Sequence, residues 1–286
     1  MVKNIRDKNF LNQLTGFDIP WEKDKGEVLQ EIIPEIQARR PKVVRLGNRR
    51  VTRSVAALLI ILLGTALFMR FHERSLESGN GEHLTHQLPD GSIVELNSGS
   101  NISYHPFWWR FERSLKFEGE AFFMVQKGKS FKVLSTLAET KVLGTSFSIF
   151  SRNRDYRVIC HTGKVKVTSL ISDHSALIEP NQEAILELDG KFKLNSREVL
   201  PEPVHWKAKL FEFTGSPLEE VLEEIERQYD VNISYPDNLS YYYTGGVDAN
   251  RDIETSLNLV CKPFKITFEE ISEGEYRLFE DTGKDN

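Results

Sequence analysis

Residues 54–69 read SVAALLIILLGTALFM and carry no charge between Arg53 and Arg70. As a helix rising about 1.5 Å per residue, this run spans roughly 24 Å, slightly less than a hydrocarbon core of about 30 Å. The two flanking arginines extend its reach by snorkelling. Apolar side chains cover every face, which disfavours the alternative of a buried helix in a soluble domain. The run therefore predicts one transmembrane helix, residues 54–70.

The charges around this run predict its orientation. Seven basic residues and no acidic one precede it: Arg39, Arg40, Lys42, Arg45, Arg49, Arg50 and Arg53. After it, two basic residues are offset by two acidic ones: Arg70, Arg74, Glu73 and Glu77. The positive-inside rule then puts residues 1–53 in the cytoplasm and residues 70–286 across the membrane. A cleaved signal peptide is disfavoured, because more than fifty residues precede the run.

The segment before the run contains an amphipathic pattern. Residues 24–40 predict a helix whose apolar stripe is interrupted at Pro34. About fifty residues bury little surface alone. Two interpretations stay open: a flexible juxtamembrane tail, or an amphipathic segment that folds onto a cytoplasmic partner. The stripe and Trp21 favour the second, since nothing else in the tail would cover them.

Composition limits the classes of protein. The chain has 286 residues, 40% hydrophobic and 28% charged, which indicates about two folded units. A net charge of −5 makes direct nucleic-acid binding a poor explanation. Cys160 and Cys261 are too few for a disulfide framework or a four-cysteine zinc site. Buried free thiols are favoured, with a disulfide between two closely packed domains as the alternative.

The pattern after residue 70 predicts two folded domains. Residues 71–82 are polar and predict a linker. Residues 83–200 alternate apolar and polar side chains between turn signals such as Asp90-Gly91 and Pro180-Asn181, which predicts an all-β domain of sandwich, barrel or solenoid type. Gly119 and Gly144 interrupt strand patterns and predict bulges or close strand approach. Residue ranges 117–125, 131–134 and 141–149 are among the expected strands.

In residues 205–280 strand-like and helix-like patterns of apolar residues alternate. Their pattern predicts a small α+β domain with the order β-α-β-β-α-β-β. Ser216, Pro217 and Glu219 resemble a capping box at the start of its first helix. The fold class is therefore mainly β with a C-terminal α+β domain, preceded by a short helical tail and one transmembrane helix.

No catalytic constellation, cofactor motif or metal motif stands out. His72, His83 and His86 lack ligand spacing and are expected to be solvated. The most aromatic segment is Phe107-Trp-Trp-Arg-Phe111, for which core packing and a partner-binding patch both stay open. We predict no enzyme, no metal and no cofactor.

Four motifs of the β region resemble those of FecR-type anti-sigma regulators, in the same order. They are Leu88-Pro-Asp-Gly-Ser, Phe117-Glu-Gly-Glu-Ala-Phe-Phe-Met-Val, Lys141-Val-Leu-Gly-Thr-Ser-Phe-Ser-Ile and His161-Thr-Gly-Lys-Val-Lys-Val. The part after them is similar to the domain that follows in Bacteroidetes members, which is itself like the small signalling domain of secretins and TonB-dependent transducers. The cytoplasmic tail, residues 1–53, is shorter than in many members.

The resemblance implies a transmembrane anti-sigma regulator in the inner membrane. Its expected partners are a cytoplasmic ECF sigma factor, the periplasmic signalling domain of an outer-membrane TonB-dependent transporter, and an intramembrane protease. The residues assigned to sigma-factor contact are apolar side chains of the tail: Phe10, Leu11, Leu14, Trp21, Leu29, Ile32, Ile33 and Ile36. The alternative is a membrane-anchored periplasmic module that binds glycan or peptidoglycan without signalling.

Overall fold

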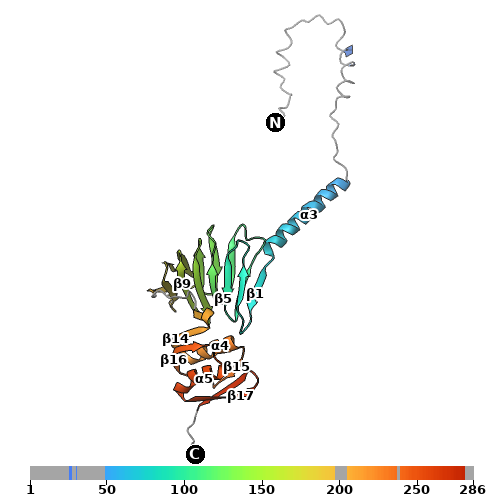
Figure 1. Cartoon of the computed structure of the whole chain (residues 1–286). Coiled ribbons are helices and arrows are strands. Elements are labelled where there is room, and N and C mark those ends of the chain that lie inside the picture. The colour runs from blue at the N-terminus through green and yellow to red at the C-terminus, as the bar shows by residue number, and fades with distance from the viewer. Residues whose placement is uncertain (1–25, 28–29, 31–48, 197–204, 237–238, 281–286) are drawn as a thin grey trace, which may run out of the picture. The chain divides into compact units, whose positions relative to one another are not determined.

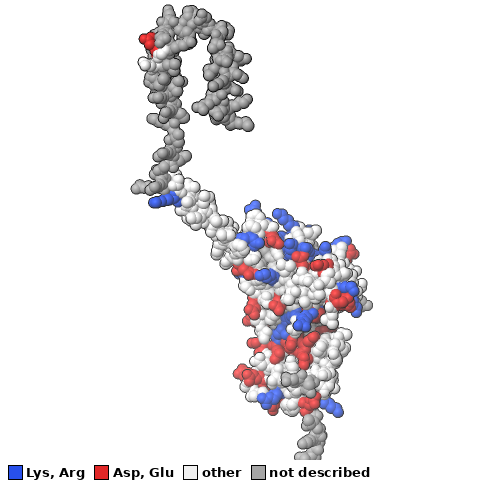
Figure 2. All heavy atoms as spheres, turned by 180° about the vertical axis from the view of Figure 1, so that it is seen from behind, with Lys and Arg blue, Asp and Glu red and all other residues white. Residues whose placement is uncertain are grey.

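The computed structural model describes residues 26–27, 30, 49–196, 205–236 and 239–280 (Figure 1). The first long element is helix α3, Arg49–Phe71. Its side chains from Val51 to Met69 are all exposed, and its surface is free of charge between its two ends (Figure 2). The segment Val51–Phe71 is long and apolar enough to cross a membrane, as the sequence predicted.

A β sandwich of residues 74–196 follows α3. One layer contains β1 (Arg74–Ser78), β4 (Ser100–Tyr104), the first half of β5 (Arg113–Met124), β6 (Phe131–Leu134), β7 (Ala138–Val142), β10 (Val165–Ser169) and β11 (Ser175–Ile178). The other contains β2 (Leu84–Gln87), β3 (Ile93–Leu96), the second half of β5, β8 (Ser146–Arg152), β9 (Asp155–Thr162), β12 (Gln182–Leu186) and β13 (Phe192–Ser196). All pairings are antiparallel except β5 with β6.

Strand β5 belongs to both layers and bends at Gly119. Before this glycine β5 pairs with β4 and β6, and after it with β3 and β8. Gly119 has φ +116°, and a Cβ there would lie 2.6 Å from the Ser100 Cα. Only glycine tolerates both this conformation and this approach. The predicted close approach at this position is confirmed.

The core of the sandwich lies between the two layers. Alternate residues of β5 point into it, so Leu115, Phe117, Ala121 and Phe123 are at most 3% exposed. Phe123 stacks on Phe147 of β8, with ring centroids 5.0 Å apart. The alternation that predicted an all-β domain is thus the alternation between core and outer face.

Two strand predictions in this domain need correction. Residues 71–82 are not only a linker, because β1 pairs with β4 over five residues. The expected strand 141–149 is two strands, β7 and β8, separated at Gly144. Gly144 has φ +154°, and a Cβ there would lie 2.7 Å from the Lys127 Cα. The chain turns from one layer to the other at this close approach.

The C-terminal domain is the predicted α+β region. Its elements are η1 (His205–Ala208), β14 (Leu210–Pro217), α4 (Leu218–Tyr229), β15 (Asn232–Ser234), β16 (Tyr242–Asp248), α5 (Ile253–Cys261), η2 (Lys262–Phe264), β17 (Ile266–Ser272) and β18 (Glu275–Glu280). One sheet pairs β14 with β16, and a second has the order β15-β18-β17. The helices pack their apolar stripes on these sheets: Leu218, Val221, Leu222 and Ile225 of α4, and Leu257 and Val260 of α5, are at most 2% exposed.

The predicted capping box before α4 is wrong. Ser216 and Pro217 are the last residues of β14, where they pair with Tyr243 and Tyr242, and no side chain caps the helix. The Leu218 N–H donates instead to the Tyr241 carbonyl oxygen at 2.9 Å. The strand pairing therefore fixes the start of α4.

Both cysteines are buried and unpaired. Burial raises the pKa of Cys160 to about 11 and that of Cys261 to about 12. The predicted buried free thiols are confirmed. The disulfide alternative does not occur.

Candidate functional site at the domain junction

The C-terminal domain covers part of the outer face of the sandwich. Phe122 of β5 points away from the sandwich core, yet it is 5% exposed, because it packs in the hydrophobic cluster of the C-terminal domain with Trp206. The Lys207 ammonium lies 4.4 Å from the centroid of the Phe122 ring and pairs with Glu95 of β3. His161 meets the same ring edge-on at 5.4 Å. Trp206 and Lys207 of the short helix η1 therefore cover the aromatic side chain of Phe122 on the outer face.

A buried ion pair lies beside this apolar contact. Arg152, the last residue of β8, reaches Glu224 of α4 with 3.3 Å between Nη1 and Oε2, and both side chains are less than a tenth exposed. Its Nη2 donates to the Ser98 carbonyl oxygen and, at 3.0 Å, to Ser100 Oγ. Arg227 Nε also donates to Glu224 Oε2, at 3.1 Å. The guanidinium of Arg152 thus joins three segments of the two domains.

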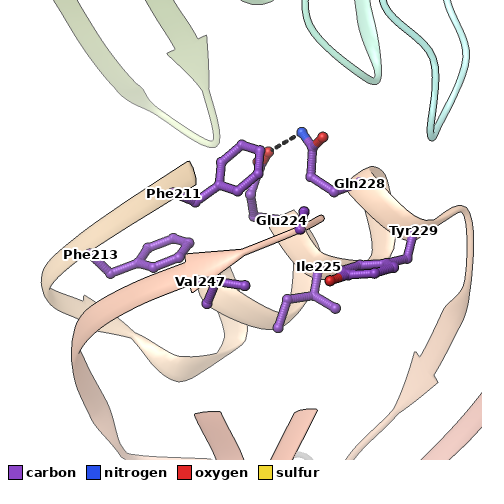
Figure 3. A pocket seen from close by; sticks show the side chains of 8 residues that line it. Phe211, Phe213, Glu224, Ile225, Gln228, Tyr229 and Val247 are labelled. Carbon is purple, nitrogen blue, oxygen red and sulfur yellow. Dashed lines mark hydrogen bonds between the residues drawn. The ribbon is translucent and has the colours of Figure 1, made fainter. Parts of the chain in front are cut away.

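Amide side chains extend the network. Gln228 Nε2 donates to Glu224 Oε1 at 2.7 Å and to Asn97 Oδ1 at 3.1 Å. Asn97 Nδ2 donates in turn to Glu120 Oε2 at 2.8 Å. Figure 3 shows Glu224 and Gln228 on α4 with the bond between them drawn. Each carboxylate therefore has a donor, as buried polar groups require. We call these five residues, Asn97, Glu120, Arg152, Glu224 and Gln228, the junction network.

In the junction network, burial and the charge of Glu224 disfavour a second negative charge on Glu120. Burial, followed by the nearby Glu224 carboxylate, raises the pKa of Glu120 to about 7. Burial also lowers the pKa of the Arg152 guanidinium, while the Glu224 carboxylate opposes that shift. The charge of the Glu120 carboxyl therefore changes near neutral pH.

The other end of the sandwich connects closely to α3. Ser103 Oγ of β4 donates to Glu73 Oε1 at 2.7 Å, and Lys116 Nζ of β5 lies 3.1 Å from the same oxygen. These two bonds lower the pKa of Glu73. His105 Nδ1 lies 3.1 Å from the His72 carbonyl oxygen. The two residues between α3 and β1 are thus held against the sandwich.

Two hollows lie near the junction network. The first, drawn in Figure 3, lies between α4 and the β14–β16 sheet. It has about 180 Å³ of empty space and is too narrow for water. Its lining consists of Glu224 and Gln228 with the mostly apolar residues Phe211, Phe213, Ile225, Tyr229, Val247 and Ala249. The second is an open polar groove of about 300 Å³ lined by Gly99, Asn101, Glu118, Gly119, Arg152, Asn153 and Arg227. Among the described residues, no three His, Cys, Asp or Glu side chains gather as a metal site.

The sigma-contact residues assigned from sequence are Phe10, Leu11, Leu14, Trp21, Leu29, Ile32, Ile33 and Ile36, and all lie outside the described residues. The sequence analysis missed the junction network. One signal was present: residues 121–125 are apolar on both faces of β5, which breaks the alternation of a half-solvated strand. Nothing local distinguishes Arg152 or Glu224 from surface charges.

Two family models match the chain. The model described as FecR protein matches residues 74–166, and the model described as FecR, C-terminal, matches residues 210–278. Together they match more than half of the chain. No functionally curated protein matches the sequence.

Solved structures agree with the family models. Two crystal structures of a candidate anti-sigma factor from Parabacteroides distasonis ATCC 8503, at 2.50 and 1.65 Å resolution, are similar to this chain with TM-scores of 0.65 and 0.64. Both are 27% identical to it, and the matches cover 74% and 73% of this chain and 100% of the solved chain.

Proposed function

The chain belongs to the FecR family of anti-sigma factors, and we propose that it relays a signal across the inner membrane to a cytoplasmic ECF sigma factor. In this proposal α3 crosses the membrane once, with residues 1–53 in the cytoplasm and the two folded domains in the periplasm. The periplasmic partner is the signalling domain of an outer-membrane TonB-dependent transporter. Intramembrane proteolysis within α3 is the proposed last step of the relay.

One observation carries this proposal: the chain from α3 to the C-terminal domain is tied together at both ends of the sandwich. Glu73 and His72 hold the end of α3 to the sandwich, and Arg152 holds the sandwich to Glu224. A partner that moves the C-terminal domain would therefore also move the sandwich and, through it, the end of α3. This arrangement suits a transmitter better than a tethered binding module.

The cytoplasmic half of the proposal depends on the tail. We assign sigma-factor contact to the apolar residues predicted from the sequence: Phe10, Leu11, Leu14, Trp21, Leu29, Ile32, Ile33 and Ile36. Burying one aliphatic side chain at an interface contributes about 1.5–3 kcal/mol. Ile32 and Ile36 lie one helical turn apart on the predicted stripe, so both would be buried together.

The test replaces both isoleucines by aspartate, Ile32→Asp with Ile36→Asp, in the full-length protein. We expect loss of co-purification with the sigma factor and a changed transcription of its target genes, because charge would be stranded in the interface. The matched control, Gln30→Asp with Gln37→Asp, adds the same charge off the stripe and should bind normally. Equal binding by both variants would favour the alternative of an anchored glycan- or peptidoglycan-binding module.

Topology is tested separately. A reporter that is active only in the periplasm should work when it is fused after residue 80 and should fail when it is fused at residue 45. The opposite pattern would reverse the proposed placement of every domain.

A further inference from the structure

The aromatic segment 107–111 divides between the core and the surface. Trp109 is 3% exposed and packs edge-on against Tyr104 and Phe131, with ring centroids 5.4 and 5.6 Å apart. Its neighbours Phe107 and Phe111 are 47% and 66% exposed. The buried tryptophan therefore anchors a turn that holds two phenylalanine side chains in solvent. Core packing, one of the two interpretations from the sequence, holds for Trp109, and a partner-binding patch stays a prediction for the exposed phenylalanines.

This turn lies against the end of α3. The Phe107 ring centroid is 6.0 Å from that of Phe68 and 5.4 Å from that of His72. The Arg70 guanidinium lies over the Trp108 ring at 5.1 Å, and Trp108 contacts Phe111 at 4.6 Å. Rings from two distant parts of the sequence thus form one surface.

We call this surface the aromatic collar and define it as Phe68, Phe71, Phe107, Trp108 and Phe111. Phe68 and Phe71 are large apolar side chains and are 57% and 67% exposed. Contiguous exposed apolar surface of this kind marks a site of protein or membrane interaction. Arg70 and the exposed Arg110 adjoin the collar and add positive charge.

We propose that the aromatic collar docks in the interfacial layer of the bilayer, at the level where α3 leaves the hydrocarbon. The partner of this surface is the bilayer, because the surface is continuous with α3. Phe68 and Phe71 belong to the last turn of this membrane-crossing helix, so a ring in contact with them lies at the same depth in the bilayer. Aromatic side chains favour this headgroup level, and arginine reaches lipid phosphates from it. The inference rests on the proposed function in one respect, that α3 crosses a membrane.

Docking would hold the sandwich on the membrane surface through two points, α3 and the turn 107–111. Without docking, the bonds of Glu73 and His72 at the end of α3 would alone set the tilt of the sandwich against the membrane. Docking of the aromatic collar therefore fixes which face of the sandwich lies toward the membrane and which face points away from it.

The experiment uses the full-length protein in bilayer nanodiscs that contain phospholipid brominated on the upper acyl chain. Bromine quenches a tryptophan only at close range, and Trp108→Phe isolates the contribution of that ring. We expect the parent to lose fluorescence in brominated relative to plain lipid, and the Trp108→Phe variant to lose markedly less. No difference between the two proteins would overturn the docking.

A second pair of variants keeps the test independent of folding. Phe107→Ser with Phe111→Ser should abolish most of the Trp108 quenching while the thermal unfolding stays as in the parent. The control, Leu177→Ser with Leu188→Ser, removes two side chains that are 55% and 98% exposed on other turns and strands and should leave the quenching unchanged. Equal quenching in both double variants would also contradict the docking.

The membrane crossing is checked in sealed spheroplasts, where protease added outside should digest the two folded domains and leave a cytoplasmic tail protected. Loss of protection would overturn the proposed function, whereas protection without Trp108 quenching overturns the docking alone. Loss of a protein partner by the Phe107/Phe111 variant, with no lipid quenching in the parent, would assign the collar to protein binding instead.

Discussion

The guanidinium of Arg152 in the sandwich lies 3.3 Å from the carboxylate of Glu224 in the C-terminal domain, and water reaches neither side chain to any large extent. Such a pair stabilises less than its charge suggests, because both groups lose hydration. Removing Arg152 is costly, because it leaves the buried Glu224 carboxylate with only the less buried Arg227 as a cationic partner. We therefore expect the pair to act as a specific link, so that the domains pack well only when both members are present.

Arg152→Ala should loosen the junction. The Glu224 carboxylate would keep Arg227 and Gln228 but lose the more deeply buried of its two arginine partners, and the Ser98 carbonyl oxygen would lose a donor. We expect the free energy of unfolding to fall by about 3 kcal/mol, together with faster proteolysis of the segment between the domains. Urea unfolding of the full-length protein in detergent, followed by tryptophan fluorescence, measures the change.

The control for this variant is Arg277→Ala. Arg277 is also a strand arginine with a carboxylate partner, Glu269 at 3.7 Å, but both side chains are more than half exposed. An exposed pair contributes about 0–1 kcal/mol. Similar losses for the two variants would show that burial does not set the cost.

Glu120 should make stability depend on pH in an unusual direction. Its pKa is raised to about 7 from an ordinary value of 4.5, so between these values the folded state keeps a proton that the unfolded state has lost. The free energy of unfolding therefore falls as pH rises through this window and is level above it. The fall attributable to this group is about 3 kcal/mol.

Glu120→Gln removes this titration while it keeps an oxygen for Asn97. The variant should gain stability relative to the parent as pH rises from 5 to 8, measured by the midpoint of thermal unfolding. Glu118→Gln, at an exposed position two residues earlier in β5, should follow the parent. A constant difference between Glu120→Gln and the parent across this range would refute the assignment.

Gly119→Ala should destabilise the sandwich. The new Cβ would overlap the Ser100 backbone, which cannot rotate away, and φ at +116° is unfavourable for any other residue. Steric strain and overpacking together cost about 3 kcal/mol or more. Gly246→Ala is the control, since the nearest atom to its Cβ would be the Phe211 carbonyl oxygen at 3.8 Å. Normal accumulation and protease resistance of both variants would contradict the bend at Gly119.

The two thiols should be inert in the folded protein. Cys160 and Cys261 are buried, and their raised pKa values keep them protonated at pH 8. An Ellman assay should detect neither thiol under native conditions and both in denaturant without reductant. Rapid reaction of one thiol in the native protein would place it at an accessible surface.

The sequence predicts the large features of this fold because they follow from the periodic spacing of apolar residues and from the glycines at close strand approaches. Alternation along β5 and β8 identifies the all-β domain, and helical spacing in α4 and α5 identifies the mixed one. Strand β1 was missed, because an edge strand with a single apolar residue, RSLES, has no apolar alternation. The start of α4 was misassigned, because the pairing of Ser216 with distant Tyr243 overrides a local capping pattern.

The junction network was beyond sequence reasoning for a different reason. Arg152 and Glu224 are 72 residues apart, and each resembles a surface charge in its own segment. Their burial depends on the packing of one domain on another. Phe122 is the exception, since an apolar side chain on the outer face of a strand indicates a covering partner.

Strand β1 has a mechanical consequence. It begins three residues after α3 ends and is bonded along one side to β4 only, over the register Arg74–Ser78. A force transmitted through α3 along the direction of this strand would load its ladder bonds in shear, all at the same time, instead of opening them one after another. Five residues would share the tension that a single peptide connection would otherwise bear. The short edge strand is in this sense the connection through which α3 and the sandwich transmit force to each other.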